Sequence, residues 1–405
     1  MKYIVMLGDG MADYPVPALD GKTPLEVANT PNMDFLAKNG AVGLAKTVPD
    51  GMSPGSDTAN LSVMGYDPEI YYTGRSPLEA VSIGIDLGAS DVTFRCNLVT
   101  LSDTENFEDA TMVDYSAGEI TTAESTELIN YLNEYFKTEA INLYAGVSYR
   151  HCLVIKDGKT GGIHTPPHDI SLKPIKDHLP KGENAQLLLE MMKKSRELLR
   201  DHPINKERIA NGKNPANSCW FWGEGTKPAV TSFEEKFGIK GGVISAVDLI
   251  KGIGICAGHE CIEVDGATGN WDTNFAGKAH AAVEFLDKGN DYIYIHVEAA
   301  DECGHHADVK HKIESIELID RDILGYIIPE MQKRGEPFTI LLMPDHPTPI
   351  TLMTHVSDPV PFVLYSSDKK LLPNAAAYTE AYAKATDLYV DKACTLVNSM
   401  INQKI

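Results

Sequence analysis

The stretch KYIVMLGDG, residues 2–10, decides the fold class, because an apolar run of strand length ends directly in Asp9. Two later runs end in the same way: IYIHVEAADECGHH, residues 293–306, and TILLMPDHP, residues 339–347. Ligands of open α/β sheets bind outside the carboxyl ends of the strands. We therefore expect the acidic and imidazole side chains at these ends, with one from a nearby loop, to meet in one crevice. They are Asp9, Asp301, His305, Asp345, His346 and the loop residue His355.

Helix-like runs alternate with strand-like runs along most of the chain. This pattern predicts an α/β fold with a mainly parallel sheet and helices on both faces. Residues 90–185 differ, because their strand-like runs have long connections around one helix. We predict that they form a smaller α+β domain inserted into a core domain of residues 1–89 and 186–405. The strand-like SCWFW, residues 218–222, is assigned to the core, and an amphipathic helix at 183–201 leads back to it.

Composition and charge limit the classes of partner. The 405 residues are 43% hydrophobic and 23% charged, as in ordinary globular proteins, and a formal net charge of −21 argues against nucleic acid or an anionic membrane. No run reaches about 18 uninterrupted apolar residues, and the first run lacks a cleavage site, so we expect neither a membrane span nor a signal peptide. Seven cysteines, an odd number at irregular spacing, predict reduced thiols in a cytoplasmic protein.

The predicted crevice has the chemistry of a metal centre. Three crowded carboxylates repel one another, and their pKa values rise unless a cation neutralises them. Carboxylates together with imidazoles are ligands for Mn²⁺, Zn²⁺ and similar ions. The set is too large for one ordinary site, whereas two ions about 3.5–4 Å apart would use it and would clamp a transferring phosphoryl group. A single Asp–His pair is usually a surface or capping feature, but its recurrence at three strand ends favours the metal centre.

Ser56, in GMSPGSDTAN at residues 51–60, allows two interpretations. A serine before an apolar helical run ordinarily caps the helix by accepting a backbone N–H. It can instead be a nucleophile at a helix N-terminus, where the dipole favours an anion. Metal coordination lowers the effective pKa of a hydroxyl and makes it a nucleophile at neutral pH. The predicted pair of metals therefore favours the nucleophile.

Taken together, these motifs resemble the cofactor-independent phosphoglycerate mutases. The similarity is to their shorter archaeal-type branch, which also occurs in bacteria and belongs to the alkaline phosphatase superfamily. It runs from residue 1 to about residue 365. The motifs that carry it are GDG (8–10), GSDTANLSVMGYDP (55–68), YYTGRSPLEA (71–80), DECGH (301–305), PDH (344–346) and THVSDPVPF (354–362).

The resemblance implies an alkaline-phosphatase-like core with an inserted cap that binds substrate. It also implies a ping-pong reaction that interconverts 3-phosphoglycerate and 2-phosphoglycerate, in glycolysis and gluconeogenesis, through a phosphoserine at Ser56. Lys251, in VDLIKGIG, matches a family lysine near the phosphoryl group. Mn²⁺ is the expected metal, with Zn²⁺, Mg²⁺ or Co²⁺ as alternatives, and 2,3-bisphosphoglycerate is not required. The implied metal ligands are Asp9, Ser56, Asp345 and His346 for one ion, and Asp301, His305 and His355 for the other.

The cap departs from the family pattern. Where the family commonly has an arginine-rich D-R-x-A-G-R motif, this chain has DYSAGEI, residues 114–120, and SCWFWGEG at 218–225 likewise has Trp222 and Glu224 where an arginine is frequent. An acidic cap suits a substrate amine, and a divergent branch of the family has been proposed to contain homoserine kinases, which serve threonine biosynthesis. The substrate-binding candidates are Arg75, Arg95, Asp114, Arg150 and His151.

Several functions therefore stay open at this point. The first is mutase activity on a small phosphorylated metabolite, and the second is homoserine phosphorylation. A further alternative is a metal-dependent phosphomonoesterase or a non-catalytic metal- or phosphate-binding protein. Assembly into a homo-oligomer is left open as well.

Overall fold

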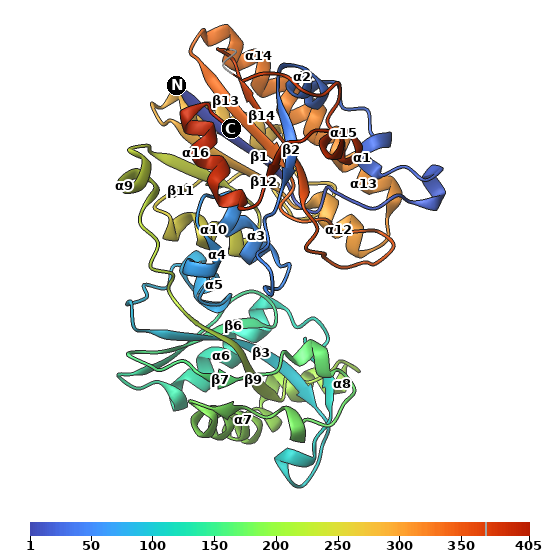
Figure 1. The fold of residues 1–405 in the computed structure, drawn as a ribbon. Coiled ribbons are helices and arrows are strands. Elements are labelled where there is room, and N and C mark those ends of the chain that lie inside the picture. Colours follow the sequence, from blue (N-terminus) through green and yellow to red (C-terminus); the bar gives the residue numbers. More distant parts are fainter. Residues whose placement is uncertain (369–370) are drawn as a thin grey trace. The chain divides into compact units, whose positions relative to one another are not determined.

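Strand β1 (Lys2–Gly8) lies inside an eight-stranded sheet of the computed structural model, which describes residues 1–368 and 371–405. The strand order is β11-β10-β12-β1-β13-β14-β2-β15 (Figure 1). β1 is parallel to both neighbours, β12 and β13. β14 is antiparallel to β13 and β2, and the other pairings among the described residues are parallel, which confirms a mainly parallel α/β fold. The remaining strands are β2 (Gly40–Ala45), β10 (Gly241–Ile244), β11 (Glu260–Cys261), β12 (Tyr292–Val297), β13 (Phe338–Met343), β14 (Val360–Ser366) and β15 (Tyr389–Val390).

The alternation of side chains along β1 explains why helices cover both faces of this sheet. Ile4 and Met6 belong to a core that includes buried residues of α2, α11 and α14, whereas Val5 and Leu7 point to the opposite face and are equally buried. Helices α10 and α16, which contact β10 and β13, contribute no residue to that core. The helices are α1 (Pro24–Val27), α2 (Pro31–Asn39), α3 (Ser56–Val63), α4 (Pro68–Tyr71), α9 (Phe233–Phe237), α10 (Asp248–Cys256), α11 (Phe275–Asp287), α12 (Ala299–His305), α13 (Val309–Leu318), α14 (Gly325–Arg334), α15 (Glu380–Ala385) and α16 (Leu396–Asn402), with 3-10 turns η1 (Pro17–Leu19) and η6 (Ala393–Thr395) and a π-helical segment η5 (Ile319–Leu324).

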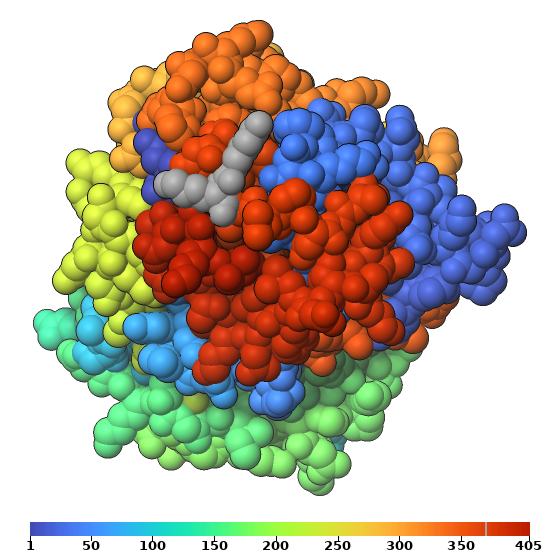
Figure 2. Space-filling view, turned by 45° about the horizontal axis from the view of Figure 1, so that its top comes forward, coloured from blue at the N-terminus to red at the C-terminus, as the bar shows by residue number. Residues whose placement is uncertain are grey.

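The two ends of the chain meet in this part of the molecule. β15 pairs in parallel with β2, and the Nε2 atom of Gln403 lies 3.6 Å from the Sδ atom of Met1. In Figure 2 the C-terminal residues, in red, lie beside N-terminal residues, in blue. Residues Met1–Tyr72 and Val230–Ile405 together form one compact unit, called unit 1 here. No helix among the described residues is both long enough and apolar enough to cross a membrane.

Unit 2, residues Thr73–Ala229, is built on an antiparallel sheet. Its long strand β3 pairs with β4, β6 and β9, and β5 pairs with β6. The strands are β3 (Val92–Leu101), β4 (Met112–Asp114), β5 (Ile141–Tyr144), β6 (Arg150–Ile155) and β9 (Ser218–Thr226), with a separate pair β7 (Gly162–Ile163) and β8 (Lys181–Gly182). The helices are α5 (Ser76–Ser82), α6 (Thr122–Phe136), α7 (Ala185–Arg200) and α8 (Pro203–Ala210), with 3-10 turns η2 (Phe107–Asp109), η3 (Pro167–Ile170) and η4 (Lys176–His178).

Unit 2 extends beyond the expected limits of 90 and 185. Helix α7 and strand β9, which were assigned to the core, belong to unit 2, because β9 pairs with β3 and α7 packs against β9. The apolar stripe of α7 includes Leu188, Met192 and Leu199, which are fully buried in the core of unit 2. Helix α5 also packs on β3 and β9. A sheet needs a covering layer on its apolar face, and residues 90–185 alone lack much of that layer.

Candidate active site

Three side chains meet where the neighbouring parallel strands β1 and β13 end. Asp9 follows β1 directly, and Asp345 and His346 follow β13 after one proline. The strands are in register, with Leu7 opposite Met343, so their ends reach the same edge of the sheet. All three side chains are fully buried, and each offers an oxygen or nitrogen atom within 4.8 Å of the others. This group therefore has the composition of a metal-binding site.

A second group shares His346 with the first. Asp301, on α12, lies with His346 and His355 in an arrangement that also suits a metal. The Nε2 atom of His355 is 3.2 Å from Oδ1 of Asp301, and Nε2 of His305 is 3.3 Å from Oδ2 of the same carboxylate. The Nε2 atoms of His305 and His355 are 2.8 Å apart. The structure thus brings together the strand-end residues that the sequence singled out.

Ser56 is the first residue of α3, and the N-cap position belongs to Gly55. The capping interpretation is therefore wrong. The Oγ atom of Ser56 is instead 3.2 Å from Nε2 of His346. Asn60, one turn along α3, donates hydrogen bonds to the backbone carbonyl of Ser56 (2.9 Å) and to Oδ2 of Asp345 (2.7 Å). These contacts place the hydroxyl against the first group, at the positive end of the helix dipole.

The electrostatics of the first group favour a cation. Burial raises the pKa of Asp9 well above its ordinary value, and the nearby charges of Asp345 and Asp301 raise it further. Its Oδ1 atom is buried, makes no hydrogen bond among the described residues, and lies 3.7 Å from Nε2 of His346. Buried polar atoms are nearly always satisfied, and carboxylate oxygens with imidazole nitrogens suit a divalent transition-metal ion. The residues present therefore fit the metal that the strand-end pattern predicts.

Sequence reasoning missed His296, which supports Asp9. The Nε2 atom of His296 lies 2.8 Å from Oδ2 of Asp9, and its Nδ1 lies 3.1 Å from Oγ of Ser245. His296 is fully buried on β12 and stands opposite Leu7 in the parallel register. The signal in the sequence was a histidine near the end of the apolar run YIYIHV, which resembles the run that ends in Asp9. Glu298, just after β12, completes a third possible ligand group with Asp9 and His296.

Lys278, also missed, is a fully buried lysine close to this group. Its Nζ atom donates a hydrogen bond of 2.8 Å to the backbone carbonyl of His296. Burial lowers the pKa of Lys278 to about 8, although the charge of Glu298 opposes that shift. The position of Lys278 on the amphipathic helix α11 gave no sign of this role, because lysines on helices are usually exposed.

Lys251, the expected lysine near the phosphoryl group, has a different partner. Its Nζ atom lies 2.7 and 2.9 Å from the two carboxylate oxygens of Glu263. It is on α10, and no hydrogen bond or ion pair joins it to the strand-end groups among the described residues. The side chain of Lys251 is 16% exposed and that of Glu263 is 75% exposed, so the pair lies at the edge of the solvent.

The arginines of unit 2 gather around one carboxylate. Arg75 and Arg95 each place Nε 2.9 Å from an oxygen of Glu79, on α5. Burial raises the pKa of Glu79, but Arg95, Arg75 and Arg150 outweigh this effect and lower it. The Arg95 guanidinium also stacks over Trp222, 4.2 Å from the ring centroid. Three arginines of unit 2 therefore act on one carboxylate.

Two cap candidates have hydrogen-bond partners within unit 2. The carboxylate of Asp114 accepts hydrogen bonds from its own loop, at Ser116 and Gly118, and from Asn214, all at 2.7–2.8 Å. These hydrogen bonds organise a turn around Asp114. His151 is buried on β6, and its Nδ1 accepts a hydrogen bond from the backbone N–H of Gly146. Burial lowers the pKa of His151 to about 3, so this neutral imidazole does not attract anions.

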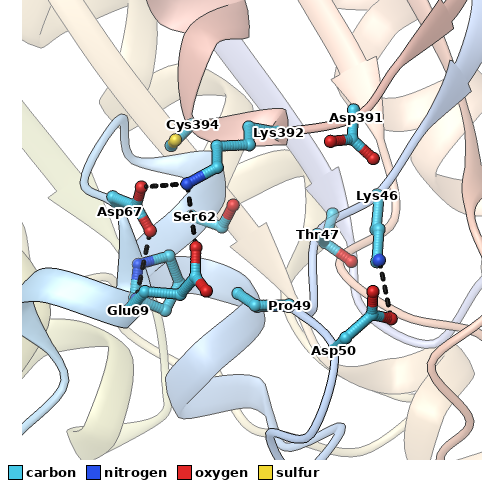
Figure 3. Close-up of a pocket in the computed structure, with 11 residues that line it drawn as sticks. Lys46, Thr47, Pro49, Asp50, Ser62, Asp67, Glu69, Asp391, Lys392 and Cys394 are labelled. Atoms are coloured by element: carbon cyan, nitrogen blue, oxygen red, sulfur yellow. Dashed lines mark hydrogen bonds and ion pairs between the residues drawn. The ribbon is translucent and has the colours of Figure 1, made fainter.

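A separate pocket of unit 1 touches helix α3 at Ser62 (Figure 3). Lys392, in its wall, pairs with Asp67 and Glu69 at 2.8 Å each. Lys46 pairs with Asp50 at 2.7 Å. Because acidic side chains of the wall already neutralise these lysines, the pocket offers no positive surface to a phosphate.

Comparison with known proteins identifies the family. The family described as 2,3-bisphosphoglycerate-independent phosphoglycerate mutase matches residues 37–205. A probable enzyme of that name from Geobacter sulfurreducens is 51% identical over 403 residues, and one from Methanosarcina barkeri is 49% identical over 405 residues; both matches cover 100% of each chain. A solved structure of a Pyrococcus horikoshii protein superposes with a TM-score of 0.82 at 31% identity, covering 100% of this chain and 98% of that one. The cofactor-independent phosphoglycerate mutase of Thermoplasma acidophilum gives 0.71 at 26% identity, with both chains fully covered. The chain belongs to the 2,3-bisphosphoglycerate-independent phosphoglycerate mutase family.

Proposed function

We propose that this protein interconverts 3-phosphoglycerate and 2-phosphoglycerate by passing the phosphoryl group through Ser56. The observation that carries the proposal is the contact of 3.2 Å between Oγ of Ser56 and Nε2 of His346, inside the strand-end groups. Full-length relatives named as such mutases, at about half identity, support it. The family name also indicates independence from 2,3-bisphosphoglycerate as a cofactor.

The strand-end residues would hold two divalent metal ions, Mn²⁺ being our first choice. Asp9, Ser56, Asp345 and His346 would hold one ion, and Asp301, His305 and His355 the other. Bound metals would lower the pKa of the serine hydroxyl and neutralise charge on the transferring phosphoryl group. The Oδ1 atom of Asp9, which makes no hydrogen bond among the described residues, supports this assignment.

Ser56 would act as the nucleophile in the first half of the reaction and as the leaving group in the second. In the first half, its Oγ forms a bond to phosphorus while the ester bond to the glycerate oxygen breaks. In the second half, the other glycerate hydroxyl attacks phosphoserine and releases Oγ, so no phosphate is lost to water. The N-terminus of α3, which begins at Ser56, would stabilise the phosphoryl oxygens through the helix dipole.

Unit 2 would recognise the carboxylate of the substrate. Arg75 and Arg95 both pair with Glu79, and Arg150 lies close enough to lower the pKa of the same glutamate. Guanidinium groups bind carboxylates in a bidentate manner. This arrangement favours an anionic glycerate over the amine of homoserine, because Asp114 is already engaged within its loop. We also propose a cytoplasmic location, which the odd number of cysteines supports.

The proposal is tested by supplying the purified protein with Mn²⁺ and either 3-phosphoglycerate, or L-homoserine with ATP. We expect formation of 2-phosphoglycerate, followed by ³¹P NMR, and no phosphohomoserine. The Ser56→Ala variant should lose turnover by at least about 10⁴-fold, since removal of a nucleophile abolishes covalent catalysis. Ser62→Ala, a buried serine on the same helix, is the matched control and should keep most activity. Turnover of homoserine alone, or an active Ser56→Ala variant, would refute the proposal.

A further inference from the structure

Thr348 lies between the two ligand groups without belonging to either. It follows His346 by two residues and is fully buried. Its Oγ1 atom makes a short hydrogen bond to Oδ1 of Asp301, and lies 3.3 Å from Nδ1 of His346. One hydroxyl thus contacts one member of each proposed metal group.

The hydrogen-bonding capacity of this hydroxyl determines where the protons lie. A threonine hydroxyl has one proton to donate, and a carboxylate oxygen can only accept. Thr348 therefore donates to Asp301 and accepts from Nδ1–H of His346. Consequently Nε2 of His346 carries the lone pair. That nitrogen is the one that faces Ser56, at 3.2 Å, and Asp345, at 3.3 Å.

The backbone of Thr348 is held on both sides. Its N–H donates to the carbonyl of Ala12 (3.2 Å), and its carbonyl accepts from the buried Nζ of Lys312 (2.8 Å). Lys312 is itself paired with Asp13 at 2.7 Å. Gly10 allows this approach, because a Cβ there would lie 2.6 Å from Oγ1 of Thr348 and from Oδ1 of Asp301. The hydroxyl is thus fixed by packing and not by a flexible loop.

We propose that Thr348 is a positioning residue that orients one ligand of each metal group, and so couples the two sites. It holds the Oδ1 atom of Asp301 and fixes the tautomer of His346 that leaves Nε2 available to a metal. This proposal rests on the two-metal assignment made above. Hydrogen-bond partners of metal ligands typically change metal affinity or activity by about 10–100-fold.

The test compares Thr348→Ser with Thr348→Ala, which both lack the methyl group and differ only in the hydroxyl. Mn²⁺ binding to each purified protein, with no substrate present, is measured by calorimetric titration, and Mn²⁺ EPR reports whether two ions lie close together. We expect Thr348→Ser to stay near wild type and Thr348→Ala to bind Mn²⁺ about 10–100-fold more weakly at both sites. Thr339→Val is the matched control, because Thr339 is a fully buried threonine on β13 whose hydroxyl approaches only Met1 Sδ, at 3.9 Å, among the described residues.

The outcomes separate this proposal from the proposed function. Wild-type Mn²⁺ affinity and EPR spectra in both Thr348→Ser and Thr348→Ala would overturn the role of Thr348 and leave the mutase proposal intact. Weakening at one site only would overturn the coupling of the two groups. Loss of affinity in Thr348→Ser equal to that in Thr348→Ala would assign the effect to packing. A wild-type protein that binds fewer than two Mn²⁺ ions would refute the metal assignment itself.

Discussion

At the scale of single residues, the site depends on side chains that direct the ligands as well as on the ligands themselves. Asp9 uses Oδ2 to accept a hydrogen bond from His296, while Oδ1 lies 3.7 Å from Nε2 of His346 and makes no hydrogen bond among the described residues. Ser245 accepts from the backbone N–H of Val247 and contacts Nδ1 of His296, so its own proton is available for that nitrogen. This series of hydrogen bonds leaves the Nε2–H of His296 to donate to Asp9 and hold its carboxylate in one orientation.

The His296→Leu variant should therefore bind Mn²⁺ about 10–100-fold more weakly, because Oδ2 of Asp9 loses its donor and the carboxylate can rotate. Calorimetric titration of the purified variant measures this change. His280→Leu, an exposed histidine on α11, is the matched control and should leave Mn²⁺ affinity unchanged. Wild-type affinity in His296→Leu would show that Asp9 keeps its orientation without the imidazole.

At the scale of elements, the sheet of unit 2 contains a histidine that its burial keeps neutral at pH 7. His151, on β6, has its pKa lowered to about 3 by burial, against an ordinary value near 6.5. Below pH 6.5 the unfolded chain binds a proton at this position that the folded chain does not. The contribution of His151 to the free energy of unfolding is therefore fully present above its ordinary pKa and is lost as the pH falls from about 6.5 towards 3.

We expect acidification from pH 7 to pH 5 to lower the free energy of unfolding by about 1–2 kcal/mol through His151 alone, given about 1.4 kcal/mol per pKa unit. Urea unfolding of the metal-free protein at both pH values measures this change. His151→Gln removes the titrating group and should reduce the pH dependence by that amount, whatever its effect at pH 7. An unchanged pH dependence in His151→Gln would contradict the burial of a neutral imidazole.

At the scale of the whole molecule, the strand-end groups connect the metal state to stability. Burial and mutual repulsion raise the pKa of Asp9, and a bound cation would relieve that repulsion only in the folded chain. A ligand present at 1,000 times its dissociation constant stabilises the folded state by about 4 kcal/mol. Unit 1 contains all the residues of both groups, so the effect should appear in its unfolding.

Treatment with EDTA should abolish mutase activity and lower the melting temperature, and added Mn²⁺ should restore both. Differential scanning calorimetry with and without the metal measures the shift, and the enzyme assay is run on the same samples. Thr339→Val should show the same shift as wild type, because the hydroxyl of Thr339 approaches Met1 and none of the proposed metal ligands among the described residues. Identical melting curves with EDTA and with Mn²⁺ would contradict a metal site in the folded protein.

The sequence alone determined the α/β class, the nucleophile candidate and the residues at the ends of the strands. It did so because strand periodicity is local, and because parallel strands deliver their last residues to one edge of the sheet. Asp9, Asp301 and Asp345 could be found in this way before any contact was known. Ser56 required their support, since a serine at a helix start is ambiguous by itself.

Only the tertiary structure decided which side chains direct those ligands and where unit 2 ends. Thr348, His296 and Lys278 are ordinary residues in the sequence, and their contacts join segments that lie 47, 287 and 18 residues apart, respectively. The limits of unit 2 depend on the pairing of β9 with β3, which joins residues that lie more than 100 positions apart in the sequence. Local propensity determines that a strand forms, but its partner is chosen by which apolar faces can be buried together, and that choice exists only in the folded chain.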